Sequence, residues 1–543
     1  MALSSLSFLL FLSLILIIYY VVPKKFQWAV LLIASYAFYL FSGIDNVIFI
    51  VSSTVFTFLS GLWMQKIRDK MKNEIALMGE KATKEYKREI KKTVSKKIHT
   101  IQVITVLVSL FVLAYVKYLN FFIDNINNLF NLFSWDASVP LINVIVPLGI
   151  SYYTFNSIGY LVDIGRGRLQ AERHLGKFAL FVSFFPSIVQ GPLMRYGDVG
   201  TQLKEHHSFD LKNIKYGAQL ILWGFFKKLV IAENVAVISN AVFSTSLPEY
   251  SGSNVLVGVI AYSFQIYCDF SGGTDITRGA AQMMGITLPV NFERPFFATS
   301  MGNFWQRWHM SLGAWMREYV FYPVMLCKPV TKISKTFRKK YGAYAGKIVP
   351  SVAAPLVVFF LIGIWHGLTW QYIINGLYNA LLISSSVALA PVFKKMIELF
   401  RIKEESFGFR IFQIARTTLL LFISRIIVKA PSINDVLPMI KAMFTNFDLS
   451  FISLFDNLIV AEQSTETRTL IAKIITIVML TAMIALLMTV DVLQEKGIKI
   501  RETIAKKNIF IRWAIFYSLI FIIILCGVYG PGYNASDFIY GNF

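Results

Sequence analysis

The feature that most constrains this 543-residue chain is a series of long apolar runs that contain very few charged residues. Each run is long enough to cross the hydrocarbon core of a bilayer as a helix, which satisfies its own backbone polar groups. Twelve candidate crossings follow from this pattern, at about 3–22, 26–42, 46–64, 100–119, 139–162, 216–243, 253–270, 348–368, 371–390, 410–428, 470–490 and 509–529. The sequence therefore predicts an all-α polytopic protein embedded in a lipid bilayer.

Charged residues lie mainly in the segments between these runs and indicate how the chain is oriented. Segment 65–99 has twelve Lys and Arg against five acidic residues, and segment 328–347 has seven basic residues and no acid. Basic loops of membrane proteins favour the cytoplasmic side. Alternation of the crossings then places both termini outside the cytoplasm. We attribute the net charge of +22 to this topology, and we predict no nucleic-acid partner.

One apolar segment, 178–192, is too short to span the bilayer and is broken by Pro186, Gly191 and Pro192. Such a segment is more typical of a re-entrant or interfacial structure than of a crossing. Non-helical backbone at membrane depth has to be buried in protein or to line a cavity that holds water. The segment therefore predicts a funnel within the protein.

Two aromatic motifs place histidines inside apolar surroundings. The first, from Phe304 to Tyr322, contains His309, and the second is Trp365-His366-Gly367. Ionisable residues within such segments are candidates for function. A neutral imidazole can accept a proton, as a general base must, and His366 has few ionisable neighbours in the sequence. The alternative is that both histidines are structural residues with satisfied hydrogen bonds.

Other ionisable residues lie within apolar stretches, and the motifs of several common enzyme classes are absent from the sequence. Arg307, Arg317, Glu318, Asp269, Asp275 and Arg425 are the other ionisable residues within apolar stretches. The alternative to a functional role is that Asp269, Arg317 and Glu318 form structural ion pairs with neighbouring residues. The three cysteines have no metal-ligand spacing, and we predict no metal site. No serine-hydrolase elbow, zinc-protease motif or nucleotide-binding P-loop is present in the sequence.

Several sequence blocks occur together in a specific order. They are Pro147 to Phe155, Phe184-Phe185-Pro186 with Gly191 to Tyr196, Trp223 to Lys228, Gln265 to Gly272, Asn291-Phe292 before Pro295-Phe296, Phe304 to Leu312, and Gly363 to Gly367. In these blocks the chain resembles the membrane-bound O-acyltransferase (MBOAT) superfamily, in its bacterial alginate O-acetylation branch. The resemblance runs from about Pro147 to Asn379 and returns at the C-terminus.

This resemblance implies a ring of about 11–12 helices around a central funnel, with re-entrant segments and an acyl donor that enters from the cytoplasm. It implies that His366 is catalytic and that His309 is a second histidine lining the pathway. It also implies that Tyr540, in the terminal aromatic motif Phe538 to Phe543, carries the acyl group outward. Gly541 stands where the family usually has an aromatic residue, and an interfacial aromatic anchor is the alternative. The expected substrate-binding residues are Arg195, Asp269, Arg307, Trp308 and Trp365.

The function expected from the resemblance is O-acetylation of an extracellular or cell-wall polysaccharide, with acetyl-CoA as the thioester donor and no bound cofactor. The expected location is the bacterial cytoplasmic membrane, and the expected partner is an extracytoplasmic SGNH-type acyltransferase. Two alternatives remain: transfer of D-alanine to teichoic acid, and a transporter without covalent chemistry. We predict three regions: N-terminal crossings at 1–138, the catalytic core at 139–391, and C-terminal crossings with the aromatic tail at 392–543.

Overall fold

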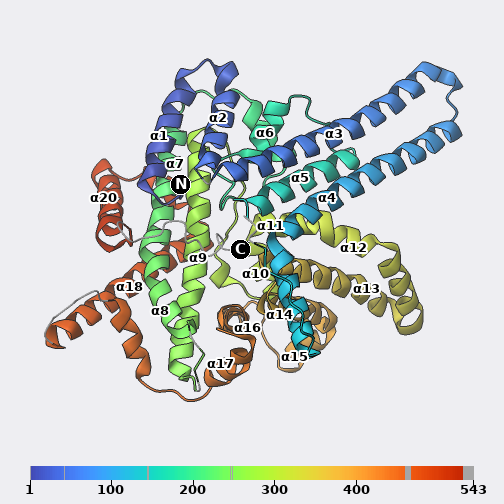
Figure 1. Ribbon diagram of the computed structural model, residues 1–543. Coiled ribbons are helices and arrows are strands. Elements are labelled where there is room, and N and C mark those ends of the chain that lie inside the picture. Colours follow the sequence, from blue (N-terminus) through green and yellow to red (C-terminus); the bar gives the residue numbers. More distant parts are fainter. Residues whose placement is uncertain are drawn as a thin grey trace. The chain divides into compact units, whose positions relative to one another are not determined.

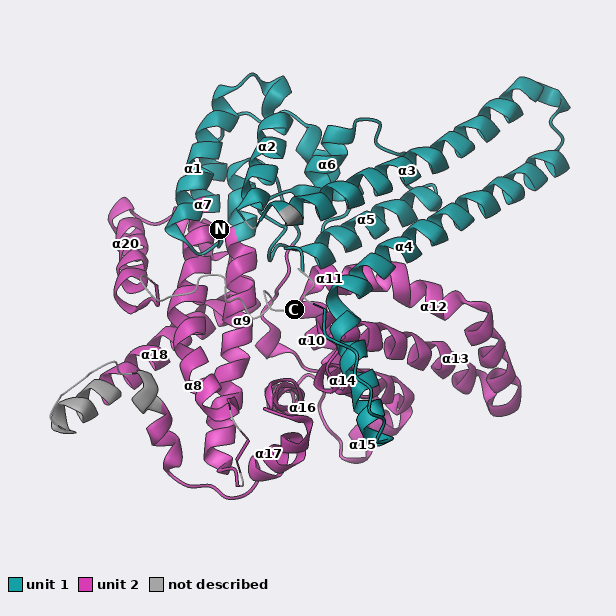
Figure 2. Cartoon of the chain, viewed as in Figure 1, with its two compact units in different colours: residues 1–217, 277–289 teal, residues 218–276, 290–543 magenta. Residues whose placement is uncertain are grey.

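The computed structural model describes residues 2–41, 43–142, 146–244, 246–247, 249–458 and 466–529. Within these ranges the chain is helical, and its extended pairing is limited to one antiparallel bridge between Phe292 and Trp308. The all-α prediction is therefore confirmed. The helices form two compact units, residues 1–217 with 277–289 and residues 218–276 with 290–543 (Figure 2).

The first unit is built from the N-terminal helices. They are α1 (Leu6–Val21), α2 (Gln27–Leu40), α3 (Ile44–Met78), α4 (Lys84–Leu132), α5 (Ile150–Gly165) and α6 (Leu175–Ser183), followed by the start of α7 (Leu211–Phe225). The two longest, α3 and α4, form an extended hairpin (Figure 1). Its turn ends where Thr83 caps α4, because the Thr83 hydroxyl accepts a hydrogen bond from the backbone N–H of Tyr86 at 3.2 Å. The basic segment 65–99 therefore forms the distal part of this hairpin.

The chain that follows α6 leaves the helical conformation while it remains buried. Residues 184–194 contain no helix, and all but one of them are buried. Side chains replace the missing helical partners: the backbone N–H of Phe185 donates to the Ser35 hydroxyl at 3.1 Å, and that of Met194 donates to Asn156 Oδ1 at 3.1 Å. The expected burial of non-helical backbone in protein is observed here, for the physical reason that unpaired backbone groups are costly away from water. The re-entrant or interfacial placement of the segment in the bilayer stays a prediction.

The second unit holds the later helices. They are α8 (Glu233–Phe243), α9 (Gly252–Met283, whose last turns belong to the first unit), α10 (Met301–Arg307), α11 (Met310–Met316), α12 (Tyr322–Leu326), α13 (Lys328–His366), α14 (Trp370–Ala388), α15 (Ala390–Leu399), α16 (Phe407–Lys429), α17 (Val436–Ala442), α18 (Glu466–Glu495), α19 (Ile500–Ala505) and α20 (Ile509–Cys526). Apolar side chains from α8, α9 and α16, among them Val235, Val259 and Ile426, form its core.

Glycines bring α13 and α14 into backbone contact. A Cβ added at Gly363 would lie 2.6 Å from the carbonyl oxygen of Tyr372, and one added at Gly376 would lie 2.4 Å from that of Phe359. Small residues are the usual means by which membrane helices approach this closely. The contact fixes the C-terminal end of α13, where His366 lies, against the start of α14.

The number of long apolar helices is smaller than the number of predicted crossings. Seven helices of the described residues are long and apolar enough to cross a membrane, or up to eight if the bent pair α14–α15 counts as one span. The predicted crossings at 3–22 and 26–42 correspond to shorter helices, α1 and α2, of 16 and 14 residues. The run at 216–243 is divided among α7, a π-helical segment Phe226–Ala232 and α8. A polytopic membrane fold is thus confirmed, and the central funnel stays a prediction.

Candidate active site

His366 is the last residue of α13 and lies beside two aromatic rings. Its imidazole packs against the indole of Trp365, with ring centroids 4.7 Å apart, and stacks on the ring of Tyr372 at 6.0 Å. His366 is partly exposed and lines a small cavity of about 40 Å³ with Asn375, Asn379 and other residues of this unit. His366 therefore lies at a cavity wall, at the C-terminal end of α13, and is not fully enclosed by apolar side chains.

His309 connects α10 to α11 and is held by unusual backbone geometry. Its φ of 46° and ψ of 52° are left-handed, a conformation that is uncommon for residues other than glycine and that clusters at functional sites. The bridge between Phe292 and Trp308 fixes the preceding residue, and the backbone N–H of Met310 donates to the Asn291 carbonyl at 2.9 Å. Neighbouring backbone on both sides therefore determines where the His309 side chain points.

The His309 imidazole is the more buried of the two, with 2% of the residue exposed. Its Nδ1 lies 3.1 Å from Asn291 Oδ1, and the edge of the Phe270 ring packs against it at a centroid distance of 4.8 Å. Burial, and secondarily the nearby His366, lowers the pKa of His309 well below its usual value. His309 is therefore neutral at physiological pH.

The two motif histidines share a single aromatic neighbour. The Trp365 indole lies 4.7 Å from the His366 ring and 6.0 Å from the His309 ring, measured between centroids. His309 lines a second cavity, of about 220 Å³. Both cavities are lined by Trp305, Phe359 and Ile362, so these three side chains lie between the spaces that the two histidines face. The structure thus brings the two sequence motifs together around one indole.

The predicted substrate-binding residues of this unit differ in their surroundings. Trp308 is buried, lines the His366 cavity and packs under the Arg425 guanidinium, 4.8 Å from its ring centroid. Arg307 forms two hydrogen bonds with the carboxylate of Glu495, at 2.9 and 3.1 Å. Asp269 is buried and forms an ion pair with Lys228. Arg307 and Asp269 therefore have partners within the protein, and their part in substrate binding stays a proposal.

Lys227 and Lys228, which lie within the apolar run predicted to cross the membrane at 216–243, are both buried. Lys227 pairs with Asp275 at 2.6 Å, and Lys228 pairs with Glu233 at 2.6 Å as well as with Asp269. Both lysines belong to the π-helical segment Phe226–Ala232, a local widening of the helix that often marks functional regions. Carboxylates on α9 and α8 compensate the buried charges, which removes the need to reach water.

Two further predicted residues cannot be placed beside the histidines. Arg195 is part of the first compact unit, immediately before a π-helical turn at Tyr196–Gly200. Tyr540 lies outside the residues that the structure describes. Their roles in donor binding and in acyl relay therefore stay predictions.

Three asparagines that the sequence reasoning missed hold the site together. Asn291 contacts His309, and Asn379 Oδ1 accepts a hydrogen bond from the Trp305 indole N–H at 3.1 Å. Asn375 Oδ1 accepts one from the Ser424 hydroxyl at 2.6 Å. The spacing of Asn375 and Asn379, four residues apart in an apolar helix that follows Trp365-His366-Gly367, was the available signal, because it places both amides on one helix face.

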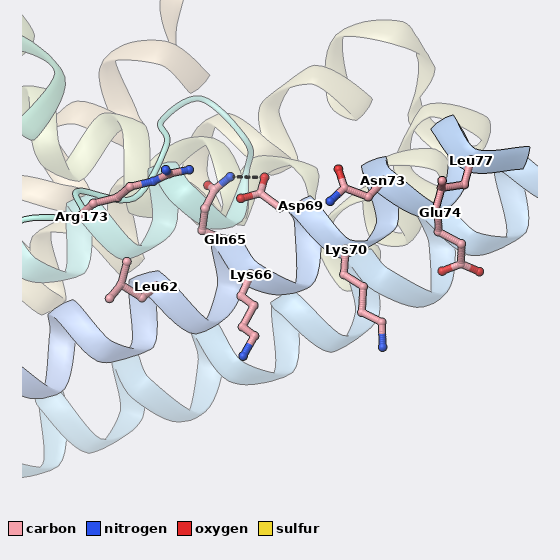
Figure 3. Close-up of a pocket in the computed structure, with 9 residues that line it drawn as sticks. All are labelled: Leu62, Gln65, Lys66, Asp69, Lys70, Asn73, Glu74, Leu77 and Arg173. Carbon is pink, nitrogen blue, oxygen red and sulfur yellow. Dashed lines mark hydrogen bonds between the residues drawn. The ribbon is translucent and has the colours of Figure 1, made fainter. Parts of the chain in front are cut away.

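A further cavity, beside the α3–α4 hairpin in the first unit, differs from the two histidine cavities in its lining. It measures about 770 Å³ and is lined by nine residues of the first unit (Figure 3). Lys66 and Lys70 extend from α3, Gln65 donates a hydrogen bond to Asp69, and Arg173 comes from another segment (Figure 3). Its lining has lysine, arginine, carboxylate and amide side chains and no histidine, whereas both motif histidines line the other two cavities, so we place the candidate chemistry there. Among the described residues, no group of three or more His, Cys, Asp or Glu side chains is arranged to hold a metal ion.

Comparison with known proteins gives this geometry a context. The model of the membrane-bound O-acyltransferase family matches residues 170–426, which include both histidine motifs. A probable alginate O-acetylase AlgI of Pseudomonas syringae pv. tomato is 30% identical over 305 residues, which cover 56% of this chain and 53% of that protein. A peptidoglycan O-acetyltransferase of Helicobacter pylori is 30% identical over 289 residues, covering 48% of this chain and 51% of the relative.

A teichoic acid D-alanyltransferase of Bacillus subtilis is 33% identical over 250 residues, covering 45% of this chain and 60% of that protein. The chain thus spans about half the length of most of the curated relatives it matches. These matches confirm the resemblance carried by the sequence blocks. Residues 170–426 of this chain, which include both histidine motifs, are similar to the membrane-bound O-acyltransferase family over the whole of the matched region.

Proposed function

We propose that this chain is a membrane O-acyltransferase that moves an acetyl group from a cytoplasmic thioester across the membrane, for O-acetylation of an extracellular or cell-wall polysaccharide. The observation that carries the proposal is that the rings of His309 and His366 pack against one indole, Trp365, while each lines a cavity. The family match and the names of the relatives support an acyl-transfer reaction.

The proposed first step joins an acyl group to a hydroxyl. His366 accepts the proton of the attacking hydroxyl while the oxygen bonds to the thioester carbonyl carbon. The carbon–sulfur bond then breaks, and the thiolate takes the proton and leaves as a thiol. General-base assistance of this kind contributes about 10²–10⁴-fold to the rate. We propose acetyl-CoA as the donor and Arg195, Asp269, Arg307, Trp308 and Trp365 as residues that bind or position it.

We propose that the hydroxyl acylated first is the phenol of Tyr540, which would divide the transfer into two steps. In the second step an acceptor hydroxyl attacks the phenyl ester, and the phenolate leaves with the proton that the acceptor gives up. An extracytoplasmic acyltransferase of SGNH type is the proposed partner for this step. The proposed location is the bacterial cytoplasmic membrane, with both termini outside, because the basic segments then face the cytoplasm.

A second candidate function is transfer of D-alanine to teichoic acid. It is favoured by the relative of that name in Bacillus subtilis, which has the same level of identity as the acetylase relatives. Both candidates use a thioester carbonyl and a base, so the histidine site serves either. They differ in the acyl donor.

The experiment that separates them supplies labelled donors to the purified protein in lipid nanodiscs. Acetyl-CoA with a labelled acetyl group is expected to leave label on the protein, and His366→Gln is expected to remove it. Labelled D-alanyl carrier protein serves as the competing donor. If the protein takes label only from the carrier, the acetyl proposal is wrong; if neither donor leaves label on protein or polymer, acyl transfer itself is contradicted.

A further inference from the structure

We infer that Asn291 is a positioning residue that fixes the tautomer of His309, so that Nδ1 carries the hydrogen and Nε2 is left as a hydrogen-bond acceptor. The inference deepens the proposed function, because it says which chemical role His309 can take. It begins with the Asn291 side chain, which is 1% exposed and therefore has no access to water as an alternative partner.

The orientation of the Asn291 amide follows from a backbone group. The N–H of Ser311, which can only donate, lies 3.1 Å from the atom assigned as Asn291 Oδ1. The Ser311 hydroxyl donates to the same atom at 2.9 Å. If the amide were turned over, its NH₂ group would face the backbone N–H, and two donors would meet in a buried place. The atom facing Ser311 is therefore the oxygen.

The tautomer of His309 follows from the same oxygen. Nδ1 of the ring lies 3.1 Å from Asn291 Oδ1, which has only lone pairs to offer. Nδ1 must therefore carry the hydrogen. The ring is neutral, because burial and the neighbouring His366 disfavour the charged form, so its only ring hydrogen is on Nδ1. Nε2 is then an unprotonated acceptor.

The remaining nitrogen has no partner in the described part of the chain. His309 Nε2 is buried and makes no hydrogen bond with the described residues. A buried acceptor without a partner is destabilising, and most buried polar atoms of native proteins have a hydrogen-bond partner. The missing partner must be a donor, and the chemistry that fits is an O–H or S–H group. His309 consequently accepts a hydrogen from the reacting molecules and does not donate one to the thioester carbonyl.

Two sources of such a group are consistent with the proposed reaction. One is the thiol released from the donor, and the other is the phenol of Tyr540. The surroundings of His309 favour either over bulk water, because Phe270 and Trp365 pack against the ring. The shared feature is a weakly acidic hydrogen next to an acceptor that is already oriented by Asn291.

The test reads the ring nitrogens directly. Solid-state ¹⁵N NMR of protein labelled at its six histidines is recorded in lipid, and the His309 signals are identified as those lost in His309→Gln. We expect a protonated Nδ1 and a bare Nε2. A protonated Nε2 would overturn the inference. No turnover is needed for this measurement, so its result is independent of whether the acyl-transfer proposal holds.

Variants of Asn291 add a functional readout. Asn291→Ala frees the ring to take either tautomer, and we expect acyl transfer to fall about 10–100-fold, by analogy with the loss of partners that orient histidines in metal sites. Asn291→Asp keeps an oxygen beside Nδ1, so we expect it to restore most of the activity at high pH. Its carboxylate favours the protonated ring, so the acidic limb of the rate–pH profile should move to higher pH.

A matched control is Asn156→Asp. The Oδ1 of Asn156 also accepts a buried backbone N–H, from Met194, but Asn156 is on α5 of the first compact unit, whereas both motif histidines belong to the second. This variant should leave the acidic limb where it is. If Asn291→Asp retains its fold and the acidic limb of its rate–pH profile does not move, the positioning role of Asn291 is contradicted.

The ¹⁵N signal of His309 Nε2 also shows which group donates the hydrogen bond to it. If a thiol supplies it, coenzyme A moves the signal and desulfo-coenzyme A, which lacks the S–H group, does not. If the phenol supplies it, the signal of Tyr540→Phe differs from that of the unmodified protein before any ligand is added. A signal that responds to neither change would overturn the assignment of an O–H or S–H partner.

Discussion

At the scale of single residues, the site depends on what surrounds each imidazole. His366 is at the end of α13 beside a cavity, and His309 is enclosed by Asn291, Phe270 and Trp365. The first can meet a substrate hydroxyl, and the second is held in one orientation. Sequence alone named both histidines but did not show that His309 is the more enclosed of the two, because burial at a helix end depends on how neighbouring helices pack.

Replacement of His366 tests the proposed base. We expect His366→Gln to reduce acyl transfer about 10²–10⁴-fold, the usual contribution of a general base, while expression and unfolding temperature change little. Label incorporation from acetyl-CoA into protein and polymer is the measurement. His99→Gln is the control, because His99 is exposed on α4 and should leave the rate unchanged. Near-normal transfer by His366→Gln would return His366 to a structural role.

The buried His309 predicts a dependence of stability on pH. Its pKa in the folded protein lies well below the value of about 6.5 expected when unfolded, so the unfolded chain binds the extra proton first. The stability from neutral His309 is complete above about pH 6.5 and is lost as the pH falls below that value. The unfolding temperature should therefore decrease less between pH 7.5 and 5.5 in His309→Gln than in the unmodified protein, as measured by thermal unfolding in detergent. Equal slopes would contradict this account.

Tyr540 can be tested although it lies outside the described residues. Tyr540→Phe keeps the ring and removes only the hydroxyl. If the phenol is the acyl relay, transfer to the external polymer should be abolished while the unfolding temperature stays the same. Ser536→Ala, which removes a nearby hydroxyl, should be almost silent. Normal polymer acetylation by Tyr540→Phe would mean that the tail is an interfacial anchor.

At the scale of helices, the position of His366 depends on the contact between α13 and α14. Gly363 and Gly376 allow the two backbones to touch, and Asn375 and Asn379 on α14 face the cavity that His366 lines. The sequence showed two apolar runs separated by Trp365-His366-Gly367. It did not show that the runs pack against each other, since either face of an apolar helix can meet lipid or protein.

A pair of glycine substitutions tests this contact. In Gly376→Ala the new methyl group would lie 2.4 Å from the Phe359 carbonyl oxygen, so the helices must move apart. We expect a destabilisation of about 1–3 kcal/mol and a loss of acyl transfer. Gly408→Ala adds the same methyl group on α16 where no atom lies within 4 Å, and it should be neutral or slightly stabilising. Thermal unfolding and label transfer measure both; equal behaviour of the two variants would argue against a tight contact.

At the scale of the whole molecule, charge distribution predicts orientation in the membrane. The α3–α4 hairpin carries segment 65–99, with twelve Lys and Arg against five acidic residues, and should lie in the cytoplasm. In a background without native cysteines, Lys81→Cys at the exposed hairpin turn should resist a membrane-impermeant thiol reagent in intact cells. Ser138→Cys, exposed in a segment predicted to be external, should react. The opposite labelling pattern would reverse the proposed topology.

The sequence by itself determined the all-α membrane class, the resemblance to an acyltransferase family and the two histidine motifs. These properties depend on the length of apolar runs, on charge and on local residue patterns, which can all be read from consecutive residues. The tertiary structure decided that Lys227 and Lys228 are buried in ion pairs, that one indole lies beside both histidines, and that Asn291 faces His309. These facts depend on side chains from separate segments meeting in space, and a hydrogen bond between two such segments leaves no periodic signal in either.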